Sequence, residues 1–211
     1  MLIDQQMTDN RQNSSKIFRS EVKFIAGAAK ISQLPKIFLP QVAFVGKSNV
    51  GKSSLINKVC NRKSLARISN TPGRTRQINF FNLANKLILT DLPGYGFAKV
   101  SAKEQQEWEK LIIYYLQNSH SLELVNILID ARRGIKENDL TIINMLSEFN
   151  KKIQIVFTKS DKIKINEKFL EENKKSLATL GYSCNVIITS SKSGLGAKEL
   201  QISMAKSIGK K

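Results

Sequence analysis

The segment from Gly46 to Ser53 combines glycines, a lysine and a serine at the spacing of a phosphate-binding loop. It follows the apolar run Val42–Val45 and opens a helical pattern. Glycines let a backbone curl around a phosphate, and the amides at a helix N-terminus face the anion. Lys52 would then reach the β- and γ-phosphates of a nucleotide, and the Ser53 hydroxyl would ligate Mg²⁺. Taken alone, the motif could also be a chance glycine-lysine turn between a strand and a helix.

A second polar segment, Asp91–Gly94, ends the apolar strand pattern Leu87–Thr90. A carboxylate at this strand tip would hold the Mg²⁺ shell through water, and the amide of Gly94 could meet a γ-phosphate. A third segment, Thr158–Asp161, ends the apolar run Ile153–Phe157. Asp161 could accept two hydrogen bonds from the N1–H and the exocyclic amine of guanine, a pair of donors that adenine lacks.

A fourth segment, Ser190-Ser191-Lys192, follows the strand pattern Asn185–Thr189, and a backbone amide there could contact the guanine oxygen. Each of these short motifs is weak alone, but all four in this order, each after its own apolar strand, predict a GTP-binding and GTP-hydrolysing domain. The competing interpretation is a P-loop ATPase or small-molecule kinase, which Asp161 and the fourth segment disfavour.

The polar stretch Arg62–Arg76 lies between the first helix and the second strand, where a GTPase keeps its first switch. A threonine in this stretch would complete the Mg²⁺ shell when a γ-phosphate is present. Thr75 stands just before the strand and Thr71 precedes a Pro-Gly turn. The residues favour Thr75 but leave both open.

Composition places the chain among water-soluble proteins with a polyanionic partner. Its 211 residues suit one domain, and 41% of them are hydrophobic. We find no apolar run long enough for a membrane span and no signal-peptide core, and the two cysteines form no CxxC motif, so we expect a cytoplasmic protein. The formal net charge is +17, from 34 basic and 17 acidic side chains. General solubility could explain this excess, but we favour RNA over a membrane surface as its partner.

The basic excess gathers in particular segments. The stretch from Gln41 to Thr75 has seven basic residues and no acidic one, and the stretch from Lys162 to Lys211 has ten basic and four acidic residues. In the first stretch the basic residues are Lys47, Lys52, Lys58, Arg62, Lys63, Arg67 and Arg74.

Periodicity predicts an alternating α/β domain in which a short turn at Asn85 makes one strand pair antiparallel. The strands are expected at Gln41–Val45, Arg76–Leu83, Lys86–Asp91, Leu122–Asp130, Ile153–Thr158 and Cys184–Thr189. Helices are expected near Ser53–Cys60, Ala102–Asn118, Asn138–Asn150, Glu167–Leu180 and Leu195–Ile208. We expect a flexible extension at residues 1–23, an ordered extension at 24–40 that packs on the domain, and a GTPase domain at 41–209.

Four sequence blocks resemble the EngB/YihA-type ribosome-biogenesis GTPases over about Phe24 to Lys206. The blocks are Ser48–Asn57, Asn70–Gln77, Asp91–Ala98 and Asp130–Gly134, with Leu34-Pro35 before the domain. The resemblance implies a Ras-like P-loop fold with a six-stranded, mostly parallel sheet, one antiparallel strand and helices on both faces. It also implies a protein of the translation-factor-related class that binds GTP, GDP and Mg²⁺. We expect the protein to be a monomer. The implied role is assembly of the large ribosomal subunit on ribosomal RNA, with a link to cell division and septation. A septin-like or membrane-associated division GTPase without a ribosomal role is the alternative.

The resemblance also implies site residues. Ser53 and Thr75 match the Mg²⁺ ligands of the family, which favours Thr75 over Thr71, and Lys47 departs from the usual arginine. The implied nucleotide contacts are Gly46, Lys47, Ser48, Asn49, Val50, Gly51, Lys52, Ser53, Gly73, Arg74, Thr75, Arg76, Gln77, Asp91, Leu92, Pro93, Gly94, Thr158, Lys159, Ser160, Asp161, Thr189, Ser190 and Ser191.

Catalysis is expected to depend on Lys52, Thr75, Gly94 and Asn49. Tyr95 stands where many regulatory GTPases place a glutamine that orients the attacking water. A phenol suits that task poorly and could point away from the phosphate, so we expect slow hydrolysis without help. Related GTPases with an asparagine at the position of Asn49 bind K⁺ near the phosphates. Asn49 could supply such a K⁺ site or only stabilise the turn of the loop.

Overall fold

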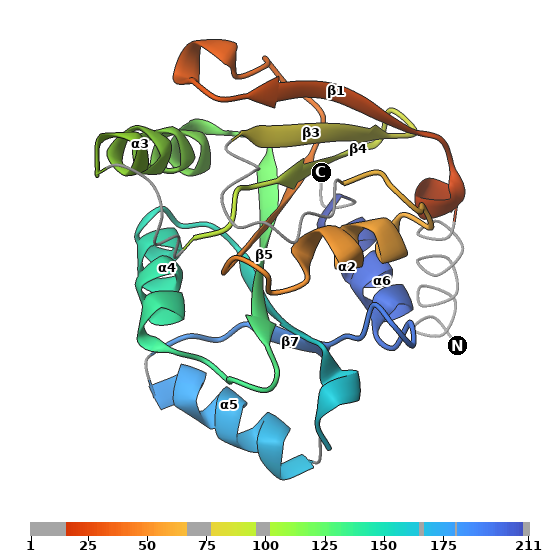
Figure 1. The fold of residues 1–211 in the computed structure, drawn as a ribbon, viewed down its shortest axis with the longest axis vertical. Coiled ribbons are helices and arrows are strands. Elements are labelled where there is room, and N and C mark those ends of the chain that lie inside the picture. Colours follow the sequence, from red (N-terminus) through yellow and green to blue (C-terminus); the bar gives the residue numbers. More distant parts are fainter. Residues whose placement is uncertain (1–15, 67–76, 96–101, 165–166, 180, 209–211) are drawn as a thin grey trace.

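The structure is a computed structural model that describes residues 16–66, 77–95, 102–164, 167–179 and 181–208. One sheet of seven strands, in the order β1-β3-β4-β2-β5-β6-β7, forms its centre (Figure 1). The strands are β1 (Val22–Ala28), β2 (Gln41–Gly46), β3 (Ile78–Leu83), β4 (Leu87–Asp91), β5 (Leu122–Asp130), β6 (Ile153–Thr158) and β7 (Asn185–Ile188).

Helices cover both faces of this sheet, as predicted (Figure 1). The helices are η1 (Ile31–Gln33), α2 (Lys52–Val59), α3 (Ala102–Asn118), α4 (Glu137–Glu148), η2 (Ser160–Lys162), α5 (Glu167–Thr179) and α6 (Ala197–Ile208). Helices α3, α4 and α5 pack on one face, where Tyr115 and Ile143 join the same apolar cluster. Helices α2 and α6 pack on the other face, where Leu55 and Met204 share a second cluster.

Strand β3 is the one strand of the sheet that runs against the others. It pairs antiparallel with both β1 and β4, whereas β2, β4, β5, β6 and β7 pair in parallel. Parallel strands place their carboxyl ends at one edge of the sheet, so the loops after β2, β4, β5, β6 and β7 meet there. This edge brings the four predicted motifs together.

The prediction of six strands is wrong, because β1 adds a seventh at the sheet edge next to β3. Its alternation was hidden by a β-bulge between Phe24 and Ala26. Phe24 therefore packs edge-on against Phe81 of the α2 and α6 face, while Ala28, four residues later, is buried with the α3 face. A bulge inserts one residue into the two-residue period, which removes the pattern on which a strand prediction depends.

The segment before β1 contributes to the core. The side chains of Ile17 and Phe18 are buried in the cluster of α2 and α6. The guanidinium of Arg62 donates to the carbonyl oxygen of Ser20 over 3.1 Å. The expected boundary between residues 23 and 24 thus falls inside β1. Among the described residues, no helix has both the length and the apolar character that crossing a bilayer requires.

Candidate nucleotide site

The loop between β2 and α2 has the tight turn that its glycines predicted. Gly51 precedes α2 with a φ of 101°, and Asn49 has a φ of 61°, both in the left-handed region that favours glycine and asparagine. The amide of Val50 donates to the carbonyl oxygen of Lys47 over 3.1 Å. The turn ends at the N-terminus of α2, where unpaired amides and the helix dipole can bind an anion.

The Asp91–Gly94 segment lies directly against this loop. The amide of Ser48 donates to the carbonyl oxygen of Tyr95 over 3.1 Å, and the amide of Tyr95 donates to Gly46 over 3.2 Å. A Cβ atom on Gly94 would come within 3.0 Å of the Ser48 nitrogen, so a side chain there would push the two segments apart. Glycine is needed at this position for the close approach of the two backbones.

Lys52 and Asp91 form an ion pair between the Nζ atom and the Oδ1 atom. Their side chains are only 10% and 4% exposed. Ser53 stands in the first turn of α2, and its hydroxyl makes no hydrogen bond to another residue of the described part of the chain. The site therefore pairs one cation with one carboxylate, and the next residue along α2 carries a hydroxyl; these are groups that a phosphate and a hard metal ion require.

The loops after β6 and β7 are joined to each other and to the phosphate-binding loop. The hydroxyl of Thr158 donates to the carbonyl oxygen of Val50 over 2.6 Å. The amide of Ser160 donates to Thr189 over 3.2 Å, and the Ser190 hydroxyl donates to Asp161 Oδ1 over 2.6 Å. Three of the four predicted motifs therefore form one connected unit around Val50, and the Asp91–Gly94 segment joins it through Ser48.

Asp161 lies exposed at the rim of this unit. The hydrogen bond from Ser190 lowers the pKa of its carboxyl group, and the backbone amide and the lysines at 162 and 192 lower it further. The group is therefore ionised and accepts hydrogen bonds only.

The phenol of Tyr95 points away from the phosphate-binding loop, one of the directions that the sequence left open. Its hydroxyl donates to the carboxylate of Asp139 over 2.5 Å, and its ring belongs to the α3 and α4 cluster. Burial, and then the Asp139 carboxylate, raises the pKa of the phenol. Asp139 is fully buried at the start of α4, where it also accepts from the Lys136 amide over 2.9 Å. The phenol therefore links the segment after β4 to the first turn of α4.

The structure does not describe every predicted residue. Gly73, Arg74, Thr75 and Arg76 lie outside the described residues, as does Thr71. Gln77 is described, but its amide donates to Asn79 over 2.8 Å and its side chain packs against Gly27 of β1. The sequence indicates Asp130 only through the family resemblance, yet its carboxylate accepts a hydrogen bond from Lys159 Nζ over 3.0 Å. The charged run after β5 was the signal that could have identified it.

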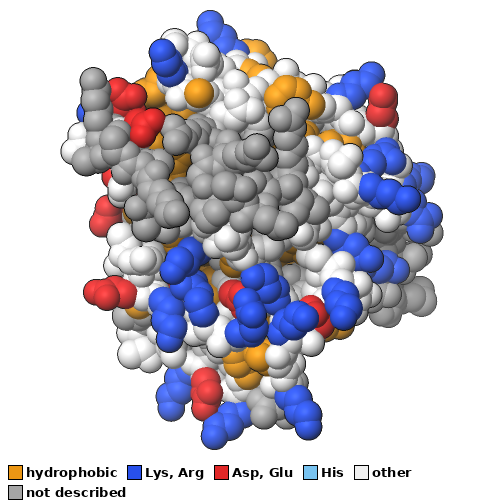
Figure 2. Space-filling model, in the orientation of Figure 1, with side chains coloured by type: hydrophobic (Ala, Val, Ile, Leu, Met, Phe, Trp, Pro, Cys, Tyr) orange, Lys and Arg blue, Asp and Glu red, His pale blue; other side chains and the backbone are white. Residues whose placement is uncertain are grey.

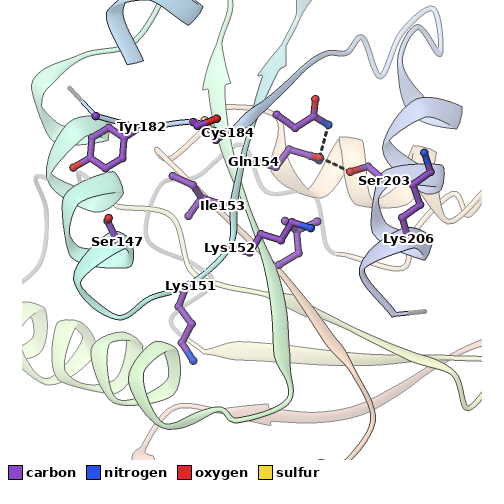
Figure 3. A pocket seen from close by; sticks show the side chains of 13 residues that line it. Ser147, Lys151, Lys152, Ile153, Gln154, Tyr182, Cys184, Ser203 and Lys206 are labelled. Atoms are coloured by element: carbon purple, nitrogen blue, oxygen red, sulfur yellow. Dashed lines mark hydrogen bonds between the residues drawn. The ribbon is translucent and has the colours of Figure 1, made fainter. Parts of the chain in front are cut away.

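A cavity of about 490 Å³ lies at the opposite edge of the sheet, beside the first residues of β6 and β7 (Figure 3). Its polar wall is internally paired, because Gln154 accepts from Asn185 and Ser203 and donates to Asn126. Lys151 Nζ donates to the carbonyl oxygen of Ser119 over 3.2 Å. The cavity is therefore remote from the four motifs, and Gln154 in its wall has protein partners for both atoms of its side-chain amide.

Comparison with known proteins gives a consistent family. A sequence profile described as 50S ribosome-binding GTPase matches residues 41–159. A protein of Rickettsia felis named probable GTP-binding protein EngB is 60% identical over 93% of this chain and 92% of its own length. Its namesake in Rickettsia akari is 57% identical over 99% of both chains.

Solved structures agree with the profile. A crystal structure of a probable GTP-binding protein engB has a TM-score of 0.63 and 25% identity, over 81% of this chain and 100% of that one. An Aquifex aeolicus Era variant bound to GDP and AlF4⁻ has a TM-score of 0.68 and 26% identity, and the match covers 83% of this chain and 58% of the Era chain. Era in complex with MgGDPNP and part of 16S ribosomal RNA has a TM-score of 0.66 and 25% identity, over 83% and 59%. The profile match, the near-full-length relatives and the connected phosphate and base loops together show that the chain belongs to the EngB family of GTP-binding P-loop GTPases.

Proposed function

We propose that the chain is a slow GTP-hydrolysing switch that assists assembly of the large ribosomal subunit in the cytoplasm as a monomer. The link to cell division and septation that the family resemblance implies belongs to the same proposal. One observation carries it: the loops that surround the nucleotide site also present exposed basic side chains. The description of the matching profile as a 50S ribosome-binding GTPase supports the choice of partner.

In this proposal Lys52 binds the β- and γ-phosphates and Gly94 contributes its amide to the γ-phosphate. The residues fit Mg²⁺, because Ser53 and Asp91 offer hard oxygen atoms beside the loop. Thr75, which lies outside the described residues, is the proposed second protein ligand. No group of three or more His, Cys, Asp or Glu side chains in the described ranges could hold a metal ion by itself. This agrees with an ion held largely by phosphate and water, whose charge offsets that of the phosphates.

Guanine selection is assigned to Asp161, with Ser190 and Ser191 contributing from the loop after β7. The Ser190 hydroxyl already orients the Asp161 carboxylate, so that the base meets a fixed acceptor. Fixed geometry lowers the entropy that binding costs and rejects a base with the wrong donors.

Slow turnover follows from the direction of Tyr95, because its buried phenol cannot orient a water molecule at the γ-phosphate. Asn49 is the proposed K⁺ ligand: its side chain is exposed at the turn of the loop. A cation beside the phosphates would neutralise charge that develops during transfer. GTPase rates measured with the ribosomal partner should be higher in K⁺ than in Na⁺ buffer, and equal rates would remove this part of the proposal.

The basic surface is proposed to contact ribosomal RNA. Lysine and arginine side chains gather in a band across the middle of the face seen in Figure 2. Exposed basic residues in the loops and helix ends around the site are Lys58, Arg132, Lys136, Lys162 and Lys192. The chain offers no stacking aromatics in a known RNA-binding motif, so recognition rests on phosphate position and RNA shape.

Co-sedimentation with purified large subunits tests the proposal. We expect binding with a non-hydrolysable GTP analogue and weaker binding with GDP. Affinity should fall about a hundredfold between ~50 and ~200 mM salt if roughly four phosphates are neutralised. The double variant Lys58→Glu/Lys136→Glu should bind weakly, whereas Lys86→Glu, in the turn between β3 and β4 at the other end of the sheet, should bind normally. Binding that ignores both nucleotide and salt would overturn the ribosomal role and leave the family assignment intact.

A further inference from the structure

The charged run Asp130–Gly134 follows β5 and has no part in the phosphate or base contacts assigned above. Asp130 ends the strand with a carboxylate that is 8% exposed. The Arg132 guanidinium grips it with two bonds, Nε to Oδ1 at 2.9 Å and a terminal nitrogen to Oδ2 at 2.6 Å. The Arg132 amide adds a third bond at 3.1 Å. Such a two-pronged pair fixes a carboxylate in orientation as well as in charge.

The held carboxylate also accepts a bond from Lys159, in the predicted base-reading motif. Lys159 Nζ lies 3.0 Å from Asp130 Oδ2 and 2.7 Å from the carbonyl oxygen of Asn49. Its Cε atom lies 3.7 Å from the place where a Cβ on Gly51 would stand. The lysine stem therefore crosses the phosphate-binding loop, and its ammonium group joins three segments: the loop, the end of β5 and the segment after β6.

The electrostatics agree with an ionised Asp130 and Arg132. The Arg132 hydrogen bonds, with Lys159, hold the pKa of Asp130 well below its usual range. The carboxylates of Asp130 and, more weakly, Asp161 raise the pKa of Arg132, so the network borders the proposed guanine acceptor. The Arg132 and Lys159 side chains are 51% and 30% exposed, and partly exposed ion pairs add little to the stability of a fold because solvent screens them. The placement of these pairs between two ligand loops is better explained by what they position.

We propose that Asp130 is a positioning residue for guanine-nucleotide binding: clamped by Arg132, it fixes Lys159 on the carbonyl of Asn49 and so locks the base loop to the phosphate-binding loop. The inference rests on the proposed nucleotide roles of these two loops and adds a residue that touches neither base nor phosphate. Without the clamp, the lysine side chain is free to leave Asn49, and both loops must be ordered anew when a nucleotide binds. The loss appears mainly as faster nucleotide release.

A double-mutant cycle on the full chain tests this role, with the dissociation rate of fluorescently labelled GDP as the readout. Asp130→Asn should raise that rate about tenfold, and Lys159→Ala should raise it at least as much. In the Lys159→Ala background, Asp130→Asn should change the rate less than twofold, because the group through which it acts is gone. Glu148→Gln, which removes an exposed carboxylate at the end of α4, is the charge-matched control and should leave release unchanged.

The outcomes separate this inference from the proposed function. If the two single effects multiply in the double variant, Asp130 does not act through Lys159 and the inference fails, while nucleotide binding stands. If wild-type protein does not prefer GDP to ADP, the proposed function itself fails. Should Asp130→Asn not fold, Arg132→Gln weakens the clamp and leaves the carboxylate in place. Arg132→Gln should raise the dissociation rate of labelled GDP about threefold in the wild-type background and leave it unchanged in the Lys159→Ala background.

Discussion

Single side chains in the site have their charge and direction set by one or two neighbours. Ser190 orients Asp161, Arg132 orients Asp130, and Asp139 holds the phenol of Tyr95. The first and third contacts join residues 29 and 44 positions apart in the chain, whereas Arg132 and Asp130 lie two residues apart. Substitutions at these positions should therefore change a defined property, such as base choice or stability, without abolishing the fold.

Asp161→Asn tests base choice. The amide presents a donor where the carboxylate only accepted, so affinity for GTP should fall on the order of a hundredfold and affinity for xanthosine triphosphate should rise. Titration with labelled nucleotides measures both changes. Because its lowered pKa keeps Asp161 ionised, this carboxylate should itself cause no loss of wild-type GTP affinity from pH 8 down to about pH 5. Equal wild-type affinity for ATP and GTP would contradict the assignment.

Tyr95→Phe tests the direction of the phenol. It removes the hydrogen bond to buried Asp139 and should cost about 1–3 kcal/mol of unfolding free energy, while the GTPase rate stays within about twofold. Urea denaturation and phosphate release measure the two effects. Tyr182→Phe, which loses a hydroxyl contact to Asn144 at the surface, is the matched control and should cost less. A large loss of GTPase rate in a stable Tyr95→Phe protein would show that the phenol acts on the phosphate.

The same contact predicts a pH dependence. The pKa of Tyr95 is raised in the folded state above the unfolded value of about 10, so the folded protein binds the proton more tightly. This contribution to stability is complete below about pH 10 and declines as the pH rises further. The unfolding free energy of wild type should therefore fall more between pH 9 and about pH 10.5 than that of Tyr95→Phe.

At the scale of elements, the start of α6 depends on a single backbone position. Gly196 has a φ of 69°, and a Cβ there would lie 1.9 Å from the carbonyl oxygen of Ile188 in β7. The glycine lets the chain turn tightly from the Thr189–Ser191 loop into the helix. Strand, base loop and helix are therefore linked within a few residues.

Gly196→Ala should destabilise the fold by more than about 2 kcal/mol, since it adds a backbone clash to the strain of a positive φ. Gly134→Ala is the matched control: its φ is 63°, but a Cβ would meet nothing within 4 Å, so only about 1 kcal/mol of strain is expected. Thermal and urea unfolding of both variants measure the difference. Equal losses would mean that the contact with Ile188 is relieved by a small shift of the loop.

At the scale of the whole molecule, the chain before β2 belongs to the fold. It supplies the edge strand β1 and two buried side chains on the α2 and α6 face. The N-terminal segment and the C-terminal helix α6 thus pack on the same face of the sheet, so N-terminal residues should matter for global stability.

Phe18→Ala should cost about 3–5 kcal/mol, because Phe18 is fully buried and its removal leaves a cavity. Phe38→Ala makes the same chemical change at a side chain that is 90% exposed and should alter stability by less than about 0.5 kcal/mol. Urea denaturation measures the unfolding free energy of both variants, analysed with the same dependence of free energy on urea concentration. A small loss at Phe18 would mean that the N-terminal segment only rests on the domain.

The sequence by itself determined the elements and motifs that follow local rules. The bounds of α3, β5 and β6 match the structure residue for residue, because their apolar periods are uninterrupted. The four motifs were identifiable because a parallel sheet brings the carboxyl ends of its strands to one edge, whatever the details of packing. The family resemblance also held, since it depends on residue order alone.

Only the tertiary structure decided what depends on contacts between distant segments. The bulge at β1 erased its period, and pairing with β3 became visible only in the folded sheet. The sequence left open whether the Tyr95 phenol points toward the phosphate or away from it. The structure shows that its hydroxyl donates to Asp139, 44 residues later in the chain. The hydrogen bond from Lys159 to Asp130 joins residues 29 positions apart and follows no spacing rule. Such contacts depend on which loops the strand order of the sheet brings together. The sequence pattern does not indicate how close two distant segments lie in the folded protein.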